Sequence, residues 1–577
     1  MDDSTFILTN PQIHQFNLPI LFGPGLFNSG AFYRPLDAVY FALIYSLSGN
    51  HAFLYHLVQL TLHLINTSLL FIFFCIFFSD SVAIFLALLF LVHPINVESV
   101  AYIGSTQSEL YFLPGIIALL LAGKKELTRN RFLLIIGLLC VGIFIKETGF
   151  LFLVLVILYR YLFKLGKLKK FLFSVVGLVV FYLLVRFLVG NVAFIEPTYV
   201  AIVTLPLHMR LLNIPSILIY YLKIFLFPLN FAVMQQWIIR SITIESFWVP
   251  LTLCLASAGL IINEGFSLYN HDKKVRSDFK LLSHDKQHNK HKKNLIHEPR
   301  RFPQYLFFFI WLVLGLGLIM QIVPLDMTVA DRWFYFPIVG ALGLIGIILQ
   351  VFLLAHPASK KTLLIGAIVI LSLLSLRTLI RTVDYKNNII LYAHDLKTSD
   401  DRDNPMLIDN YIIELKSAGK TDEALKYAEQ SVSLDNNTLG TRITAYEYLA
   451  LLYQAKDQND VRALPAFEKA AALAKTTVPN DIKPSFVDVI YRNLADAYLF
   501  EYKSNDAFTF INTQALKQFP NDPCLYGELA IAENNLGSSL AAKKATAKAY
   551  MLSHLQNNEL TIPSDSTLNN MCGFSTQ

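Results

Sequence analysis

The chain has 577 residues, of which 54% are hydrophobic and only 16% are charged, and its formal net charge is +6 at pH 7. Soluble globular proteins carry about 25% charged residues, so this composition excludes a chain that is water-soluble throughout. The net charge is too small to indicate a nucleic-acid partner, and none is expected.

The apolar residues are concentrated over 51–265 and 303–381, whereas 400–577 has the composition of an ordinary soluble domain. A membrane-spanning helix needs about 17–25 apolar residues. The sequence therefore predicts an all-α protein that begins with a polytopic membrane helix bundle over 1–390. The expected spans are 54–78, 81–97, 105–122, 131–146, 148–164, 170–190, 208–228, 245–264, 303–323, 334–354 and 361–380.

Lys and Arg gather in four hydrophilic segments, 124–131, 160–170, 267–301 and Lys360-Lys361. The positive-inside rule places all four in the cytoplasm. We expect 267–301, which is rich in Lys and His, to be a disordered loop. The turns between the other ends of the spans, and everything after residue 400, then lie on the outer face. Segment 208–228 breaks the parity of this count, so it is expected to re-enter the membrane or lie along it.

The soluble region, 400–560, shows internal repetition, and 561–577 is expected to be a disordered tail. Its units place small residues where two helices would cross, and a tyrosine or glycine at the turn, as stacked helix pairs require. The pattern resembles tetratricopeptide repeats in an α-solenoid; a generic helical bundle is the alternative. The units are 410–437, 446–479, 494–520 and 525–555.

Polar side chains within or beside membrane spans are costly to insert and therefore informative. Asp2 and Asp3 could supply a general base or hold a divalent cation, with a solvated chain terminus as the alternative. Arg34 precedes an apolar helix, where its planar fork suits a phosphate, or where it could anchor the helix at the interface.

Four polar residues, His56, Gln59, His63 and Asn66, are spaced to lie on one face of a helix. We expect this stripe to face the protein interior or a water-filled cavity and to form hydrogen bonds between helices. The histidine spacing could also suit zinc, but no third ligand is evident nearby, and no metal is predicted.

Further polar blocks lie at the ends of other apolar segments. Glu98 near His93 could belong to a substrate-binding cluster. Lys146-Glu147 lies between two apolar runs, where the lysine could neutralise a lipid phosphate or the two could form an ion pair. Arg332 could hold a phosphate at the outer lip, beside the interfacial aromatic Tyr335.

Taken in order, these blocks resemble the transmembrane and tetratricopeptide-repeat-containing O-mannosyltransferases and their bacterial relatives, within the GT-C superfamily. The resemblance covers nearly the whole chain, and its specificity lies in the order of short motifs and in the repeats. The motifs are Asp2-Asp3, Tyr33-Arg34-Pro35-Leu36, His56 with His63, His93-Pro94 with Glu98, Lys146-Glu147-Thr148, and Asp331-Arg332 to Pro337.

The resemblance implies a GT-C-like bundle whose active site faces away from the cytoplasm. It implies a polyprenyl- or dolichyl-phosphate sugar as donor, and an acceptor polypeptide positioned by the repeats. It also implies a membrane helix before the acidic pair, which we expect to be missing from this sequence, and an arginine where Gln107 stands. The implied roles are catalytic base for Asp2 or Asp3, lipid-phosphate binding for Arg34, Lys146 and Arg332, and support of the substrate site for His56, His63, His93, Glu98, Glu147 and Tyr335.

The function expected from these features is a membrane glycosyltransferase that moves a sugar, with mannose as the expected one, to a protein hydroxyl. It would lie in the bacterial inner membrane or the endoplasmic reticulum. The first alternative is a transporter or flippase with an appended scaffold, which would need charged residues near the bilayer midplane. The second is an inactive membrane anchor that displays the repeats for protein binding.

Overall fold

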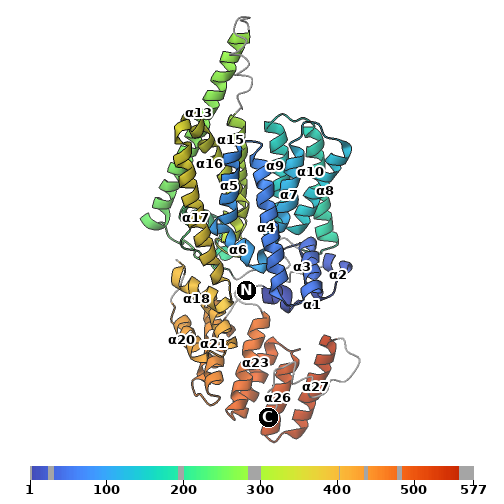
Figure 1. Ribbon diagram of the computed structural model, residues 1–577. Coiled ribbons are helices and arrows are strands. Elements are labelled where there is room, and N and C mark those ends of the chain that lie inside the picture. Colours follow the sequence, from blue (N-terminus) through green and yellow to red (C-terminus); the bar gives the residue numbers. More distant parts are fainter. Residues whose placement is uncertain are drawn as a thin grey trace. The chain divides into compact units, whose positions relative to one another are not determined.

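The structure is a computed structural model that describes residues 3–23, 32–192, 200–283, 301–399, 401, 403–434, 439–476 and 484–557. Over these residues the ordered elements are helices, and no β-strand is formed. The chain divides into two compact units, Met1–Asp401 and Arg402–Gln577 (Figure 1).

Ten helices of unit 1 run lengthwise between its two ends, among the residues described (Figure 1). They are α4 (Ala52–Phe74), α5 (Asp80–Val92), α7 (Gln107–Ala122), α8 (Arg129–Ile145), α9 (Phe150–Leu162), α10 (Leu168–Leu188), α13 (Val249–Ser283), α15 (Arg301–Ile319), α16 (Pro337–Ala355) and α17 (Lys360–Asp384). The shorter helices are α1 (Pro11–His14), α2 (Leu18–Phe22), α3 (Pro35–Ser48), α6 (Val97–Ala101), α11 (Ala201–Thr204) and α18 (Asn388–Thr398), with 3₁₀ turns η2 (Pro94–Asn96), η3 (Ile103–Ser105), η4 (Glu147–Gly149), η6 (Asp331–Tyr335) and η7 (Pro357–Ser359), and π turns η1 (Ser4–Leu8) and η5 (Ile244–Trp248).

Contacts between loops define the two ends of unit 1. At the first, Arg160 donates hydrogen bonds to the carbonyls of Ala122 (2.7 Å) and Lys124 (3.2 Å), and Lys167 donates to the carbonyl of Leu127 (2.6 Å). We call this the basic end, because two of the predicted cytoplasmic Lys- and Arg-rich segments, 124–131 and 160–170, meet there. The opposite end, which carries the loops at 33–34, 93–107, 146–149 and 320–335, is called the polar end.

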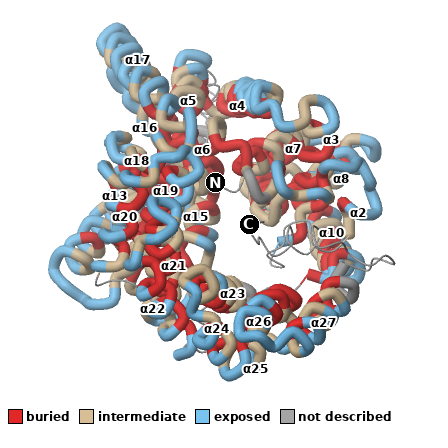
Figure 2. The backbone as a smooth tube through the Cα atoms, turned by 90° about the horizontal axis from the view of Figure 1, so that it is seen from below, coloured by how far each residue is buried: buried red, intermediate tan, exposed pale blue. Residues whose placement is uncertain are grey.

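The all-helical character predicted from the sequence is confirmed for the described residues, and the helices include apolar ones of membrane-spanning length. In the described part of the chain, eight helices are long and apolar enough to cross a membrane, or nine if one bent pair counts as a span. Large apolar side chains on their outer faces are exposed, such as Phe173 (77%) and Leu188 (78%), whereas the buried residues face inward (Figure 2). These features are consistent with an integral membrane protein.

Three of the eleven predicted spans do not meet these criteria as continuous helices. The segment 81–97 bends by 48° between α5 and the following turn, because Pro94 cannot donate the backbone hydrogen bond that would continue α5. Helices α8 and α9 have 17 and 13 residues, which at 1.5 Å per residue is less than the ~30 Å hydrocarbon core. They form a hairpin that turns at Lys146–Gly149.

Helix α12 (Leu207–Leu226) touches one segment of the polar end at two points along its length. Arg210 donates to the carbonyl of Gln321 (3.0 Å), and the Tyr221 hydroxyl donates to the carbonyl of Ala330 (3.1 Å). Although its length and composition would also fit a span, these contacts favour a helix that lies along the polar end. The same arrangement was expected for 208–228 from the charge parity.

The disordered loop predicted over 267–301 is wrong for its first part, because α13 continues to Ser283. No Gly or Pro interrupts the chain between Phe266 and Ser283, so nothing there breaks the helix. Asp272 accepts hydrogen bonds from the backbone of Arg301 (3.2 Å) and Phe302 (3.1 Å), which ties α13 to the start of α15. Residues 284–300 lie outside the described part.

Close approach of α15 and α16 depends on small residues. A Cβ atom at Gly340 would lie 2.5 Å from the backbone nitrogen of Leu312, and one at Gly343 would lie 2.0 Å from the Phe308 ring. The two glycines therefore let Phe308 and Trp311 pack against α16, as small residues do between membrane helices. Phe308 and Trp311 belong to the aromatic core of unit 1, in which Trp311 is fully buried.

Unit 2 consists, in the described residues, of four successive helix pairs, which overlap the four units read from the sequence. The tetratricopeptide assignment itself stays a prediction, and the tail over 561–577 lies outside the described residues. The pairs are α19 (Pro405–Ser417) with α20 (Thr421–Val432), α21 (Leu439–Lys456) with α22 (Ala463–Lys475), α23 (Pro484–Phe500) with α24 (Ser504–Phe510), η8 (Ile511–Ala515) and α25 (Leu516–Gln518), and α26 (Pro523–Asn535) with α27 (Ser539–Asn557).

Left-handed residues close three of these pairs, at Gly419 (φ 72°), Tyr502 (φ 58°) and Gly537 (φ 80°). A side chain in this conformation costs about 1–2 kcal/mol. We expect Gly419→Ala to destabilise the first pair by about that amount, measured in the full chain as faster amide hydrogen exchange over 405–432. Gly366→Ala, at a helical position with open space around it, should leave exchange there unchanged; equal exchange in both variants would refute the strained turn.

Candidate functional site

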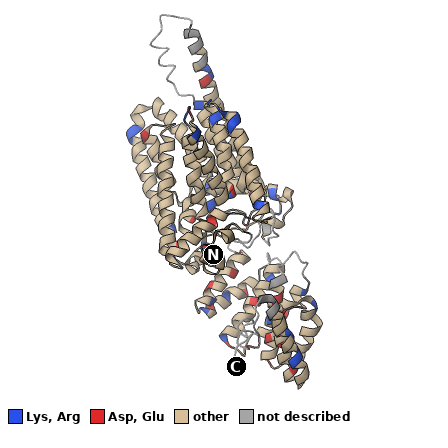
Figure 3. Cartoon of the chain, turned by 90° about the vertical axis from the view of Figure 1, so that its right-hand side faces the viewer, with Lys and Arg blue, Asp and Glu red and all other residues tan. Residues whose placement is uncertain are grey.

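Most of the residues singled out from the sequence lie in the turns and short helices of the polar end of unit 1. Charged side chains are sparse along the middle of the long helices (Figure 3). The polar end instead brings together segments that are far apart in the sequence. Glu98 and Arg332, for example, are more than 200 residues apart and form an ion pair there. Asp2 lies outside the described residues, so its position is not part of this account.

A chain of hydrogen bonds connects Asp3 to Arg34. One carboxylate oxygen of Asp3 accepts a hydrogen bond from the backbone N–H of Gly104 (2.8 Å). The side chain of Gln107 donates to the carbonyl of Gly104 (3.1 Å). Arg34 in turn donates to the side-chain oxygen of Gln107. Gln107, which lies in the stretch where the resemblance implies an arginine, thus bridges Gly104 and Arg34 without adding a charge.

Glu147 is the shared acceptor for several donors of this end. It accepts from Arg34 Nε (2.7 Å) and from the backbone of Tyr33 (3.2 Å), and Arg186 Nη1 of α10 lies 3.8 Å away. The η4 turn that presents Glu147 packs tightly on α8, since a Cβ atom at Gly149 would lie 2.6 Å from the Gly142 carbonyl group. The ion pair considered for Lys146-Glu147 therefore forms with Arg34 and not with Lys146.

Lys146 has a neutral hydrogen-bond partner. Its ammonium group donates to the Ser108 hydroxyl (3.0 Å) and lies 5.9 Å from the centre of the Tyr111 ring. Arg34 and Arg332 repel the positive charge of Lys146 electrostatically, whereas Asp37 and Glu147 attract it. Lys146 thus belongs to the same charged cluster as both arginines, although no carboxylate lies within ion-pair distance of it among the residues described.

Arg332 and Glu98 form a buried ion pair. The Arg332 guanidinium contacts one Glu98 oxygen, and the backbone N–H of Arg332 donates to the other (2.9 Å). Glu98 is 1% exposed, and the guanidinium lies 5.9 Å from the ring centres of both Tyr102 and Trp333. Tight pairing holds the η6 turn against α6 and fixes the direction of Arg332.

A second buried group extends this pair toward α12. Asp331 accepts a hydrogen bond from the Tyr220 hydroxyl (2.6 Å), which itself accepts from Gln235 (2.7 Å). Neither Tyr220 nor Gln235 is predicted from the sequence as part of a site. The only signal for Tyr220 was a tyrosine inside an apolar segment, which is too common to indicate a partner.

The predicted histidine stripe is partly wrong. Gln59, His63 and Asn66 are buried, and His63 and Asn66 both contact the Tyr335 hydroxyl, at 3.1 and 3.2 Å. His56 is exposed. It lies about one turn nearer the N-terminal end of α4 than Gln59, at the edge of the buried face. His56 therefore does not join the buried cluster.

His93 lies at the break between α5 and η2. One ring nitrogen is 3.0 Å from the carbonyl of Phe225 and the other accepts from the backbone of Ile95 (3.2 Å). These contacts hold the break of α5 against α12. Both nitrogens are thus engaged by backbone groups, and the ring is 3% exposed, so any contribution to a substrate site would be through positioning of the chain.

Two buried carboxyl groups were missed in the sequence. Asp37 lies one residue beyond the Tyr33–Leu36 motif, is 0% exposed, and interacts electrostatically with Arg34 and Lys146. Glu109, also 0% exposed, lies in the first turn of α7. None of their four carboxyl oxygens has a hydrogen-bond partner in the described structure. An acidic residue within an apolar run was the available signal for both.

Comparisons with models of known protein families and with curated proteins found no match to this sequence. Within the described residues, no group of three or more His, Cys, Asp or Glu side chains is arranged to hold a metal ion. What the described site offers chemically is the Asp3 carboxylate and the cations Arg34, Lys146, Arg186 and Arg332, of which the three arginines already lie within ion-pair distance of glutamates.

Proposed function

We propose that the chain is a membrane glycosyltransferase, which moves a sugar from a polyprenyl- or dolichyl-phosphate donor to a hydroxyl group of an acceptor polypeptide. Mannose is the first sugar to test. The observation that carries the proposal is the chain of contacts from Asp3 through Gly104 and Gln107 to Arg34 and Glu147. It gathers a carboxylate and several cations at one end of a bundle whose helices could span a membrane.

The proposed reaction is one displacement at the anomeric carbon of the sugar. The acceptor hydroxyl oxygen forms the new bond to that carbon as the Asp3 carboxylate takes its proton. The bond from the anomeric carbon to the phosphate oxygen breaks, and the lipid phosphate leaves with the electron pair. A phosphate is already a good leaving group, so the site needs cations to stabilise its charge and no acid to protonate it.

Among the cations at this end, Lys146 is the best placed to take that phosphate, because its charge is not already compensated by an ion pair in the described structure. Arg34 is paired with Glu147 and Arg332 with Glu98, so part of the charge of each arginine is already compensated. Lys146 instead donates to the neutral Ser108 hydroxyl. Exchanging this bond for one to a phosphate oxygen would leave no carboxylate behind without its partner.

Substitution of Lys146 tests the proposal directly. We expect Lys146→Met to lower transfer from radiolabelled polyprenyl-phosphate mannose by about 10²- to 10³-fold, as loss of one charge-stabilising donor does elsewhere. Lys124→Met, at an exposed position of the basic end, should transfer at the unchanged rate. Wild-type protein that transfers no sugar from this donor class, or a Lys146→Met variant as active as the control, would count against the function.

The transporter alternative receives less support. It calls for charged residues near the middle of the helices, whereas the buried acids Asp37 and Glu109 both lie in first turns, at the polar end. The proposal further places this end on the extracytoplasmic side of a bacterial inner membrane or of the endoplasmic reticulum. It assigns the helix pairs of unit 2 to binding the acceptor polypeptide.

A further inference from the structure

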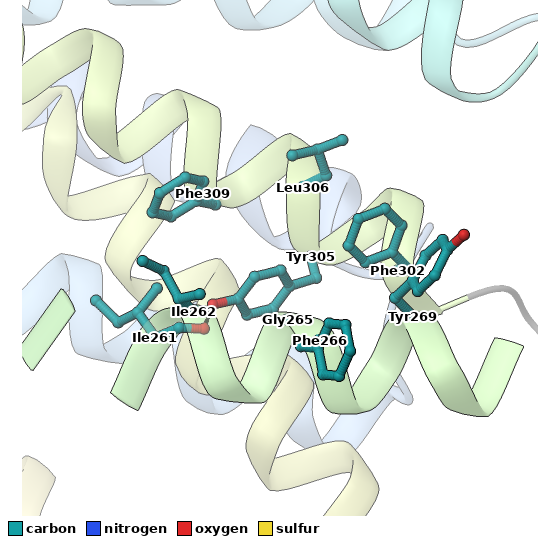
Figure 4. A pocket seen from close by; sticks show the side chains of 9 residues that line it. All are labelled: Ile261, Ile262, Gly265, Phe266, Tyr269, Phe302, Tyr305, Leu306 and Phe309. Atoms are coloured by element: carbon teal, nitrogen blue, oxygen red, sulfur yellow. Dashed lines mark hydrogen bonds between the residues drawn. The ribbon is translucent and has the colours of Figure 1, made fainter. Parts of the chain in front are cut away.

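An apolar groove lies between α13 and α15, away from the polar end (Figure 4). It encloses about 260 Å³ and is open on one side, where Ile262 (66%), Phe266 (63%) and Tyr269 (46%) are exposed. Both helices are long and apolar enough to cross a membrane. The lining is completed by Ile261, Gly265, Phe302, Tyr305, Leu306 and Phe309.

Gly265 makes room for the floor of the groove. A Cβ atom at Gly265 would lie 2.8 Å from the ring of Tyr305, so a larger residue would displace that ring. Tyr305 is 5% exposed, and its hydroxyl donates to the carbonyl of Ile261. The Tyr305 hydroxyl thus has its hydrogen-bond partner within the protein, and only the apolar ring faces the groove.

The lining of α13 continues into a cation. Ile262, Phe266, Tyr269 and Lys273 follow one another at spacings of four, three and four residues, which places them on one face of a helix. Lys273 and Lys274 are exposed. Two acidic residues lie nearby: Asp272 is buried and accepts hydrogen bonds from the backbone of α15, and Glu264 interacts electrostatically with Tyr305 on the floor of the groove. The open groove thus ends beside positive charge.

The dimensions fit one leaflet of a bilayer. The apolar lining of α13 extends over seven helical steps from Ile262 to Tyr269, which is ~10 Å, and Lys273 lies ~6 Å further along the helix. The hydrocarbon of one leaflet is ~15 Å deep, with phosphate groups just beyond it. Lys273 therefore stands at headgroup level when the groove lies within the acyl region.

We propose that this groove binds one acyl chain of an anionic phospholipid in the leaflet at the basic end, with Lys273 contacting its phosphate-bearing headgroup. This acyl chain would cover the exposed faces of Phe266 and Tyr269. This lipid is distinct from the sugar donor, whose phosphate is assigned to the polar end, and the proposal does not depend on the proposed enzymatic activity.

Lipid retention by the full chain tests the proposal. Protein released from nanodiscs of equal phosphatidylglycerol and phosphatidylcholine is analysed by native mass spectrometry. We expect one retained phosphatidylglycerol, with a preference over phosphatidylcholine that falls about fivefold in Lys273→Gln, the contribution of one lysine near a charged surface. Lys124→Gln changes an exposed lysine in a loop of the basic end and should keep the full preference.

Two groove variants separate lipid binding from general charge. Leu306→Trp, which fills the groove, should abolish retention of either lipid, and Phe266→Ala, which opens it, should weaken retention without blocking the site. Equal retention of both lipids by the wild type, or an unchanged preference in Lys273→Gln, would overturn the proposal. A dimer that carries no lipid would overturn it as well, because the groove would then be an interface between copies.

Discussion

Replacement of Asp3 by asparagine is expected to lower the rate of sugar transfer by about 10²- to 10⁴-fold, the usual contribution of a general base. Asparagine keeps the oxygen that accepts the hydrogen bond from the backbone of Gly104. The segment should therefore stay in place while the negative charge and the proton-accepting ability are lost. The measurement is transfer from polyprenyl-phosphate mannose at saturating donor.

Comparison with two other variants gives this result its meaning. Asp3→Ala removes the hydrogen bond as well, so it should be at least as inactive as Asp3→Asn. Asp80→Asn changes an exposed acid at the start of α5, at the basic end, and should be fully active. Asp3→Asn activity equal to that of Asp80→Asn would remove Asp3 from the mechanism and leave Asp2 as the base to be tested.

Arg332→Ala is expected to destabilise unit 1 by about 3–5 kcal/mol, because it leaves a buried carboxylate without its counter-charge. Glu98 is 1% exposed and would keep only the backbone N–H of residue 332 as a donor. Burying an unpaired charge is far more costly than losing an exposed ion pair. Trp333, adjacent in the chain, provides a fluorescence signal for thermal unfolding in detergent.

The matching double variant distinguishes this cause from a general packing defect. Arg332→Ala combined with Glu98→Gln removes both charges and should recover much of the lost stability, because the remaining amide can still accept the backbone hydrogen bond. Such recovery is a coupling energy between neighbours. An unfolding midpoint for Arg332→Ala that equals the wild type, or a double variant less stable than the single one, would contradict the account.

Hydrophobic runs and charge patterns predicted much of the fold. The boundary between an apolar first part and a soluble helical second part follows directly from composition, and the turn at Lys146–Gly149 was expected from two polar residues between apolar runs. The breaks that were missed depend on backbone chemistry that hydropathy does not report, as at Pro94. The helix that continues through 267–283 was not predicted, because a low apolar content is typical of both disordered segments and solvent-exposed helices.

For the site, the sequence identified individual charges but not their partners. Arg34 and Glu147 are 113 residues apart, and Glu98 and Arg332 are 234 apart, and no local pattern indicates such a pairing. An ion pair between the neighbours Lys146 and Glu147 was therefore one of two interpretations of this turn, whereas the Glu147 carboxylate contacts Arg34. Asp37 was not predicted as a site residue, because its burial depends on how α3 packs against the rest of unit 1, which no local sequence pattern indicates.

Among the described residues of unit 1, the number of lengthwise helices is even, which has a consequence for how the chain tolerates deletion. The chain enters α4 and leaves α17 at the same end, with α12 lying along that end. Loss of one lengthwise helix between residues 98 and 332, from α7 to α15, would invert every later segment, so that residue 332 would emerge opposite residue 98 and their pairing could not form. Loss of two consecutive helices would preserve the orientation of the remainder, and such double deletions are the ones that evolution or an engineer could accept.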